Sequence, residues 1–327
     1  MNASTKDVMV SGNGTAPVST MIFTLNEEVH LPSCLASLNW CDDVIVVDSF
    51  STDRTEEICR ERSIRFVQHA FEGFGTQRNW ALDNVPTKYP WVLILDADER
   101  VPEDLAREID QRLRSVPSDV GAFRVRRRFH MWGHWLRYSS LYPSWVVRLV
   151  HKDRVRYLNR GHAETQTVEG KIEELRNDLI DENLKGIDEW FERQNRYSRK
   201  DADHELSQSW SKHPFRDYFS REPLRRRTAF KALVGRVPGR GLLFFIYVYV
   251  FRCGFLDGRD GFVLCSMRAM YQTMVAIKKH DARRRPAGPP GIVPSQSGDE
   301  AIQRGSLSRG QQDSTVPSTA ARKSATS

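Results

Sequence analysis

The chain has 327 residues, of which 39% are hydrophobic and 28% are charged, and its formal net charge is +7. This length holds one large domain or two small ones with an ample core, and the composition excludes a fibrous or wholly disordered protein. The 5 cysteines form no C-x-x-C pair, which favours free thiols in a reducing compartment over a disulfide framework. Residues 1–17 lack the apolar core of a signal peptide, so we expect a cytosolic catalytic part, and no apolar run reaches the length of an ordinary spanning helix.

After a polar, Gly/Ser/Thr-rich start, expected to be disordered over residues 1–16, predicted strands and helices alternate. Apolar runs predict four strands, at residues 18–25, 43–48, 64–67 and 91–96. Helical patterns between them predict three helices, through residues 31–38, 56–61 and 74–82. This alternation is typical of βαβ units, so we expect an α/β fold of Rossmann type, with a mostly parallel sheet and helices on both faces.

Acidic side chains stand where three of these strands end. The strand at 91–96 runs into Asp96 and Asp98, the second strand ends in Asp48, and Glu27 follows the first. Ligands of open α/β sheets bind at the carboxyl ends of the strands, and no Gly-rich phosphate loop follows the first strand. A sheet that binds phosphates without such a loop needs a cation, so we predict a Mg²⁺ or Mn²⁺ site at these acids. The alternative is structural, with Asp48 and Asp98 as turn formers and Glu27 as a first-turn acid of a helix.

Four blocks occur in a fixed order: Thr24-Leu25-Asn26-Glu27-Glu28, Asp48-Ser49-x-Ser51-Thr52-Asp53-x-Thr55, Gln77-Arg78-Asn79 and Asp96-Ala97-Asp98-Glu99. Together they resemble the family-2 glycosyltransferases of GT-A fold, over about residues 18–130. The resemblance implies a nucleotide-sugar site, expected to take a UDP-sugar, with these residues: Thr24, Asn26, Glu27, Asp48, Asp53, Arg78 and Asp96. In it Glu27 and Asp48 would contact the base and ribose, and Arg78 the nucleotide. Asp96 would lie near ribose and metal, and Asp98 would ligate the ion that bridges the diphosphate.

Beyond the fourth strand, residues 121–128 alternate apolar and basic side chains, which predicts an antiparallel strand with one wet face. Residues 129–145 are dense in aromatic side chains, which suit the stacking of acceptor sugars and equally suit packing under a long loop. Residues 146–150 and 155–158 are predicted to form a hairpin.

An inverting transfer needs a carboxylate that deprotonates the acceptor hydroxyl, and we predict Glu164 for this role. The segment from Arg160 to Glu164 resembles the one that follows this position in the lipopolysaccharide-core and exopolysaccharide subset of the family. By that resemblance, His162 would ligate the metal or touch the diphosphate. The family segment more often has His and Glu adjacent, and Asp178 and Asp181 are rival bases.

An amphipathic helix is predicted at residues 186–198, completing a catalytic domain that spans residues 17–210. Residues 216–240 contain eight Arg or Lys and two acids, and an apolar stretch at 241–251 and an apolar helix at 262–277 follow. Basic residues beside short apolar helices predict a membrane-surface region at 211–283, with a buried helical hairpin as the alternative. Nucleic-acid binding is not expected because the adjoining surface is apolar, and residues 284–327 are expected to be disordered.

The sequence therefore predicts an inverting, metal-dependent glycosyltransferase (a hexosyltransferase) at the cytoplasmic face of the inner membrane. It would transfer a sugar from a nucleoside-diphosphate sugar to a lipid-linked glycan in lipopolysaccharide or exopolysaccharide synthesis. One alternative is transfer to polyprenyl phosphate, which needs no carboxylate base because a phosphate is already nucleophilic. The other is a membrane-bound, nucleotide-sugar-binding scaffold without catalysis.

Overall fold

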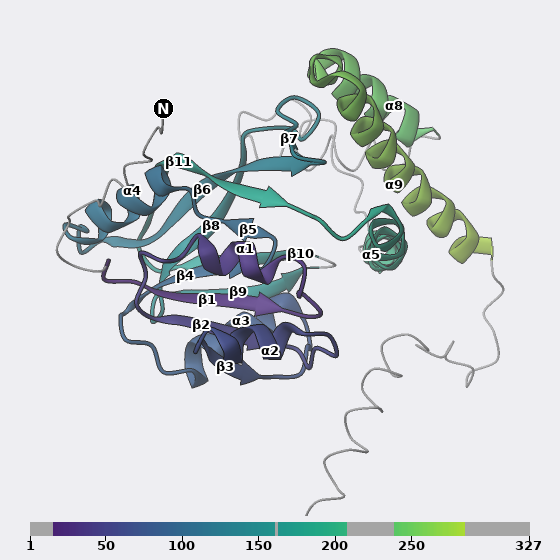
Figure 1. Ribbon diagram of the computed structural model, residues 1–327. Coiled ribbons are helices and arrows are strands. Elements are labelled where there is room, and N and C mark those ends of the chain that lie inside the picture. The colour runs from purple at the N-terminus through teal and green to yellow at the C-terminus, as the bar shows by residue number, and fades with distance from the viewer. Residues whose placement is uncertain (1–15, 161–162, 208–238, 285–327) are drawn as a thin grey trace, which may run out of the picture. The chain divides into compact units, whose positions relative to one another are not determined.

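The computed structural model describes residues 16–160, 163–207 and 239–284 (Figure 1). Its main sheet has 9 strands in the order β3-β2-β1-β4-β8-β6-β11-β5, with β7 beside β6, and a second sheet pairs β9 with β10. The strands are β1 (Ser19–Thr24), β2 (Val44–Asp48), β3 (Arg65–Gln68), β4 (Trp91–Asp96), β5 (Glu99–Arg100), β6 (Val120–Met131), β7 (His134–Trp135), β8 (Ser144–His151), β9 (Val155–Arg160), β10 (Ala163–Val168) and β11 (Lys171–Glu182).

The four strands predicted from the first hundred residues form the parallel half of the main sheet. β1 lies between β2 and β4, β3 flanks β2, and all three pairings are parallel. In the other half, β8 is antiparallel to both β4 and β6, β11 is parallel to β6, and β5 is antiparallel to β11. The fold is thus a mixed α/β fold of GT-A-like type.

Helices cover both faces of the sheet, as the alternation along the chain predicts (Figure 1). On one face, Ile22, Val46 and Leu95 pack with side chains of α1 (Leu31–Ala36), α2 (Thr55–Glu61) and α4 (Glu103–Leu113). On the other, Met21 and Ile94 pack against α3 (Phe74–Asn84) and strand β9. Because neighbouring residues of a strand point to opposite faces, each apolar strand contributes to both cores.

The predicted hairpin of residues 146–150 and 155–158 is wrong. β8 does not pair with β9; it lies between β4 and β6, and β9 pairs with β10 instead. The physical reason is burial: β9 places Tyr157 against α3, and Asn79 of that helix exchanges hydrogen bonds with the backbone of Tyr157, with distances of 2.8 and 2.9 Å. The predicted strand at residues 121–128 is antiparallel to β8, but it is also parallel to β11.

The C-terminal part is helical. The helix predicted at residues 186–198 extends over α5 (Ile187–Ser207), which packs against α9 (Gly258–Arg284). α8 (Arg240–Ile246) also packs on α9, and a π-helical turn and a 3-10 turn connect the two. Among the described helices none is long and apolar enough by itself to cross a membrane, although the segments Arg240–Phe251 and Gly254–Arg284, bent by 76°, pass that test as a pair.

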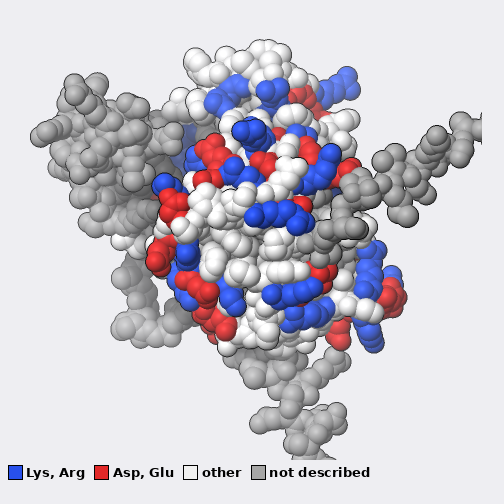
Figure 2. Space-filling model, turned by 90° about the vertical axis from the view of Figure 1, so that its left-hand side faces the viewer, with Lys and Arg blue, Asp and Glu red and all other residues white. Residues whose placement is uncertain are grey.

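Three predicted regions lie wholly or mostly outside the described residues: the disordered start (all but Ala16), most of the basic segment at 216–240, and the tail after Arg284. The five cysteines are free thiols, as expected. On the face that Figure 2 shows, acidic and basic side chains are closely intermixed. That face of the described chain therefore offers no broad basic surface of the kind that nucleic acids bind.

Candidate active site

The carboxyl ends of β1, β2 and β4 meet at one edge of the sheet. Thr24 pairs with Asp48 in register, and Phe23 pairs with Asp96, so the three strand ends lie side by side. The hydroxyl of Thr24 donates a hydrogen bond of 2.8 Å to Asp48. The edge where the sequence predicts a ligand site therefore exists, and it contains several of the predicted residues.

Three of the predicted nucleotide-site residues connect the loops after β1 and β2. Asp48 is fully buried and accepts hydrogen bonds from the backbone and side chain of Ser51. The side chain of Asn26, whose φ of 55° is in the left-handed region, accepts the N–H of Thr52 at 2.7 Å. Asp53 accepts the N–H of Glu28 at 2.9 Å. These bonds fix the two loops against each other and so shape the edge of the site.

Glu27 lies at the same edge and is paired on both sides. One carboxylate oxygen contacts Nδ1 of His30 at 2.6 Å, and the other contacts Nζ of Lys185 at 2.6 Å. Lys185 comes from the segment after β11, so Glu27 ties the first βα unit to the end of the mixed half of the sheet.

Asp96 is held between two buried arginines. Arg78 donates to one of its carboxylate oxygens at 2.7 Å, and Arg148 of β8 donates to the other. Arg148 also bonds Glu99 at 2.7 Å, and Glu99 accepts the N–H of Asp96 at 3.0 Å. Burial by itself raises the pKa of Asp96, but Arg148 and Arg78 outweigh it and hold that pKa below its usual range.

The guanidinium of Arg78 is only 4% exposed and lies over the rings of Phe23 and Tyr157. In this structure it therefore positions Asp96. The predicted contacts of Asp96 and Arg78 with a nucleotide and a metal stay predictions.

Asp98 stands in the opposite situation. Among the described residues, no hydrogen-bond donor or cation contacts its half-buried carboxylate. Burial, followed by the charge of Asp181 and then those of Asp96, Glu99 and Glu27, raises the pKa of Asp98 well above its usual value. Carboxylates gathered in this way repel one another unless a cation is shared among them.

Asp181 comes to this place from far along the chain. β11 runs antiparallel to β5, so Asp181 pairs with Glu99, and the next residue's N–H bonds the carbonyl of Asp98 at 3.0 Å. Arg127 lies 3.1 Å from the Asp181 carboxylate, and burial still raises the pKa of Asp181. Arg193 of α5 opposes this rise in the pKa of Asp181 but does not overcome it.

Both carboxylate oxygens of Asp178, the other rival base, already accept hydrogen bonds. It is 3% exposed and is contacted by Arg126 at 2.6 Å, by Arg128 at 2.7 Å and by the hydroxyl of Tyr142 at 2.9 Å. Charge-assisted hydrogen bonds from two guanidiniums and a phenol fix this carboxylate in place, which suits a structural role better than proton transfer.

The side chains of the two remaining predicted residues lie outside the part of the structure that is described. Glu164 belongs to β10, where its backbone pairs with Asn159, but its side chain lies outside the described part of the structure, and so does all of His162. Among the side chains that are described, no group of three or more His, Cys, Asp or Glu is arranged to hold a metal ion.

Arg148 is the residue that the sequence analysis missed. Its signal is visible in the sequence, because it interrupts the apolar run Val146-Val147-Arg148-Leu149-Val150. A charge inside a buried strand requires a partner, so the run itself calls for a carboxylate nearby, and Asp96 and Glu99 are those partners.

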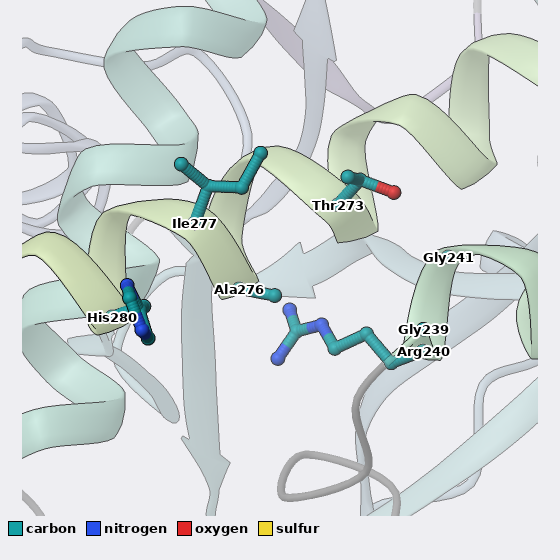
Figure 3. Close-up of a pocket in the computed structure, with 7 residues that line it drawn as sticks. All are labelled: Gly239, Arg240, Gly241, Thr273, Ala276, Ile277 and His280. Carbon is teal, nitrogen blue, oxygen red and sulfur yellow. The ribbon is translucent and has the colours of Figure 1, made fainter.

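Two hollows are found in the C-terminal part. One, of about 240 Å³, lies between the start of α8 and α9, where Arg240 extends toward Ala276 (Figure 3). Arg240 is already paired there with Glu205 at 3.0 Å, so the hollow offers no uncompensated charge. The other, of about 320 Å³, lies between residues 137–143 and 251–253.

Comparisons with known proteins identify the domain. Residues 19–172 match the family "Glycosyl transferase family 2". The chain is 27% identical over 284 residues to "Lipopolysaccharide core biosynthesis glycosyltransferase LpsC" of Rhizobium meliloti, covering 83% of this chain and 95% of that protein. An uncharacterized glycosyltransferase of Rickettsia bellii is 34% identical over 106 residues, which are 32% of this chain and 35% of that one.

Among solved structures, S. aureus TarS 1–349 aligns with 14% identity and a TM-score of 0.37, over 85% of this chain and 94% of that one. Such a TM-score does not establish a shared fold. The family match instead covers the strands that end in Asp48 and Asp96 and the turn with Asp98, and the similarity to LpsC extends over most of the chain. Residues 19–172 therefore form a family-2 glycosyltransferase domain, and the chain is a glycosyltransferase.

Proposed function

We propose that this enzyme transfers a sugar from a nucleoside-diphosphate sugar, expected to be a UDP-sugar, to a lipid-anchored glycan of lipopolysaccharide core or exopolysaccharide type. The observation that carries the proposal is Asp98: a carboxylate at the carboxyl edge of the sheet, without a partner among the described residues, whose pKa is raised by burial and by the charges of Asp181 and Glu27. Stability of the sheet does not explain Asp98, because an unpaired carboxylate near other acids lowers the stability of the folded state.

We assign different roles to the acids of the donor site at this edge. Asp98, with Asp181 beside it, would hold a divalent cation such as Mg²⁺ or Mn²⁺, whose oxygen-rich ligand preference both carboxylates satisfy. A bound cation would neutralise charge on the departing diphosphate. Asp96 is already held by Arg78 and Arg148, so we assign it to orienting the nucleotide rather than to being the main metal ligand.

For the acceptor hydroxyl we keep Glu164 as the proposed base, with an inverting outcome. β9 and β10 carry it next to α3, whose Asn79 bonds the backbone of Tyr157. We favour Asp181 over Asp178 as the rival base, because three donors already bind the carboxylate of Asp178.

The acceptor class comes from the relative. LpsC is described as a glycosyltransferase of lipopolysaccharide core biosynthesis, and this chain spans 95% of its length. We therefore propose a glycan of that type, attached to a lipid, as the acceptor.

The donor proposal is tested by thermal unfolding of the full chain with UDP, with and without Mn²⁺. A ligand present at about a hundred times its Kd stabilises the folded state by about 2.7 kcal/mol, which raises Tm by several degrees. We expect this rise with UDP and Mn²⁺ together and little of it with UDP plus EDTA. An equal rise in both conditions contradicts the metal assignment, and no rise with any nucleoside diphosphate contradicts the donor site.

A second part of the proposal concerns location: the enzyme sits on the cytoplasmic face of the inner membrane. Between α8 and the start of α9, nine large apolar side chains are at least 38% exposed within the described structure: Leu242, Leu243, Ile246, Tyr247, Val250, Phe251, Phe255, Leu256 and Phe262. Soluble monomers rarely expose such a patch, and short apolar helices beside basic residues are typical of segments that lie in a lipid surface. We name the bilayer surface as its partner.

Vesicle sedimentation tests this placement. Leu242 and Leu256 are 66% and 57% exposed, so replacing both by serine removes apolar surface without opening a core. We expect the double variant to bind phosphatidylcholine–phosphatidylglycerol vesicles at least about tenfold more weakly, since each lost side chain contributes on the order of 1 kcal/mol or more of burial. Ile172→Ser, at an exposed position of β11, is the matched control. Unchanged binding of the double variant contradicts the membrane-surface assignment.

A further inference from the structure

The hollow of about 320 Å³ next to residues 137–143 combines features that the donor site does not use. Its walls are formed by residues of the catalytic sheet's loop and of the C-terminal helices: Arg137, Tyr138, Tyr142, Pro143, Phe251, Arg252 and Cys253. It thus holds two guanidinium groups and three aromatic rings in one depression.

The two sides of this hollow are joined by Asp257. Its carboxylate accepts hydrogen bonds from the N–H groups of Tyr138 at 2.9 Å and Ser139 at 2.7 Å, and from the hydroxyl of Ser139 at 2.6 Å. From the other side of the hollow, Arg252 donates a hydrogen bond of 3.1 Å to the carbonyl of Tyr142. Four bonds to backbone and buried groups make the hollow a fixed feature rather than an accidental gap.

The hollow holds two guanidiniums, and the carboxylate of Asp257 beside it accepts the backbone N–H of Arg137 at 3.2 Å instead of pairing with either guanidinium. Among the described residues, neither Arg137 nor Arg252 has a carboxylate within ion-pair distance. The guanidinium of Arg137 lies over the rings of Trp135 and Tyr138, at 5.6 and 5.7 Å from their centroids. This stacking orients the group while leaving its N–H donors for an anion.

The hollow also has the right neighbours for an acceptor. Tyr142, which lines it, donates its hydroxyl to Asp178, three residues before Asp181 on β11. On the other side, Phe251 is 74% exposed and belongs to the apolar patch described above. A molecule bound here would lie between the catalytic edge and the lipid surface.

We infer that this hollow binds an anionic saccharide, carrying a phosphate or carboxylate group, of the lipid-anchored acceptor. The arginines take the anionic group, and the aromatic rings pack against the sugar faces. This inference rests on the proposed function, because it names the acceptor chemistry of the same enzyme.

The test measures binding without turnover, using the full chain. The probe is deep-rough lipopolysaccharide in phosphatidylcholine–phosphatidylglycerol vesicles, compared with vesicles that lack it and with vesicles holding the same lipopolysaccharide after removal of its phosphates. We expect lipopolysaccharide to strengthen binding and dephosphorylation to reduce that gain.

The variant pair is Arg137→Gln with Arg252→Gln. Loss of two charge-assisted contacts should weaken the lipopolysaccharide-dependent part of binding by at least about tenfold. Binding to vesicles without lipopolysaccharide and stabilisation by UDP and Mn²⁺ should both be retained. Arg107→Gln with Arg114→Gln, which removes two exposed guanidiniums from α4, is the matched control and should bind as the wild type does.

Lysine substitutions at positions 137 and 252 should restore part of the binding, because they return the charge without the planar fork. If the glutamine pair binds lipopolysaccharide as well as the wild type, or loses binding to all vesicles equally, the inference is wrong. If UDP and Mn²⁺ do not stabilise the wild type, by contrast, that result counts against the donor site and not against the hollow.

Discussion

Replacing Asp98 by alanine is expected to lower turnover by about 10²–10³-fold, the usual cost of removing a key electrostatic contact in the transition state. The variant should also lose the Mn²⁺-dependent part of UDP stabilisation. Its stability without ligands should be equal to or higher than that of the wild type, since Asp98 has no partner among the described residues and is repelled by Asp181. Initial rates and thermal unfolding measure the three effects.

Asp104→Ala is the control for this experiment, because Asp104 is an exposed acid in the first turn of α4. It should retain wild-type rates. Should the Asp98 variant keep more than about a tenth of the wild-type rate, the electrostatic role assigned to Asp98 would be untenable.

The second large effect is expected for Glu164→Gln. Removing a general base costs about 10²–10⁴-fold in rate, while nucleotide binding does not depend on it. The variant should therefore show normal stabilisation by UDP and Mn²⁺ and a strongly reduced kcat. Steady-state kinetics together with thermal unfolding separate these two quantities.

Asp181→Asn provides the comparison, because it is the rival base and also the neighbour of Asp98. If Asp181 helps to hold the cation, its variant loses UDP stabilisation as well as rate. A Glu164→Gln enzyme of full activity would instead favour an acceptor that is already nucleophilic, such as polyprenyl phosphate. A loss of rate confined to Asp181→Asn, with UDP stabilisation intact, would transfer the role of base to Asp181.

Local patterns in the sequence were sufficient for the parallel half of the fold. Each apolar run there ends in a polar residue that cannot be buried alone, so both the strand and its ligand edge follow from the same few residues, as at Asp48 and Asp96. The four-block resemblance to family-2 glycosyltransferases agrees with the family match over residues 19–172.

Strand pairing in the other half could not be predicted in the same way. An apolar run indicates that a strand is buried but not which strand it pairs with. The sequence therefore predicts a hairpin of β8 and β9, although β8 lies between β4 and β6. The position of Asp181 has the same origin. It depends on the pairing of β11 with β5, about eighty residues earlier in the chain, which no local pattern records.

The Arg148 network shows a further limit of assigning roles by motif. Asp-x-Asp predicts two equivalent acids, yet the structure gives them different surroundings: Asp96 is neutralised by two guanidiniums, and no cation contacts Asp98 within the described chain. Arg78 of α3 and Arg148 of β8 make this difference, and they decide which of the two acids remains available for a cation.

The carboxylate of Asp257 also bears on how such an enzyme can evolve. This side chain, from the segment after α8, accepts the backbone N–H groups of a loop that belongs to the sheet. The loop therefore depends on the C-terminal helical region for its hydrogen-bond acceptor. If the C-terminal helices were exchanged for those of another transferase, these N–H groups would lose their acceptor unless the new segment placed a carboxylate at the same position. The loop of the sheet and the C-terminal helices are therefore expected to be exchanged only together, as one unit.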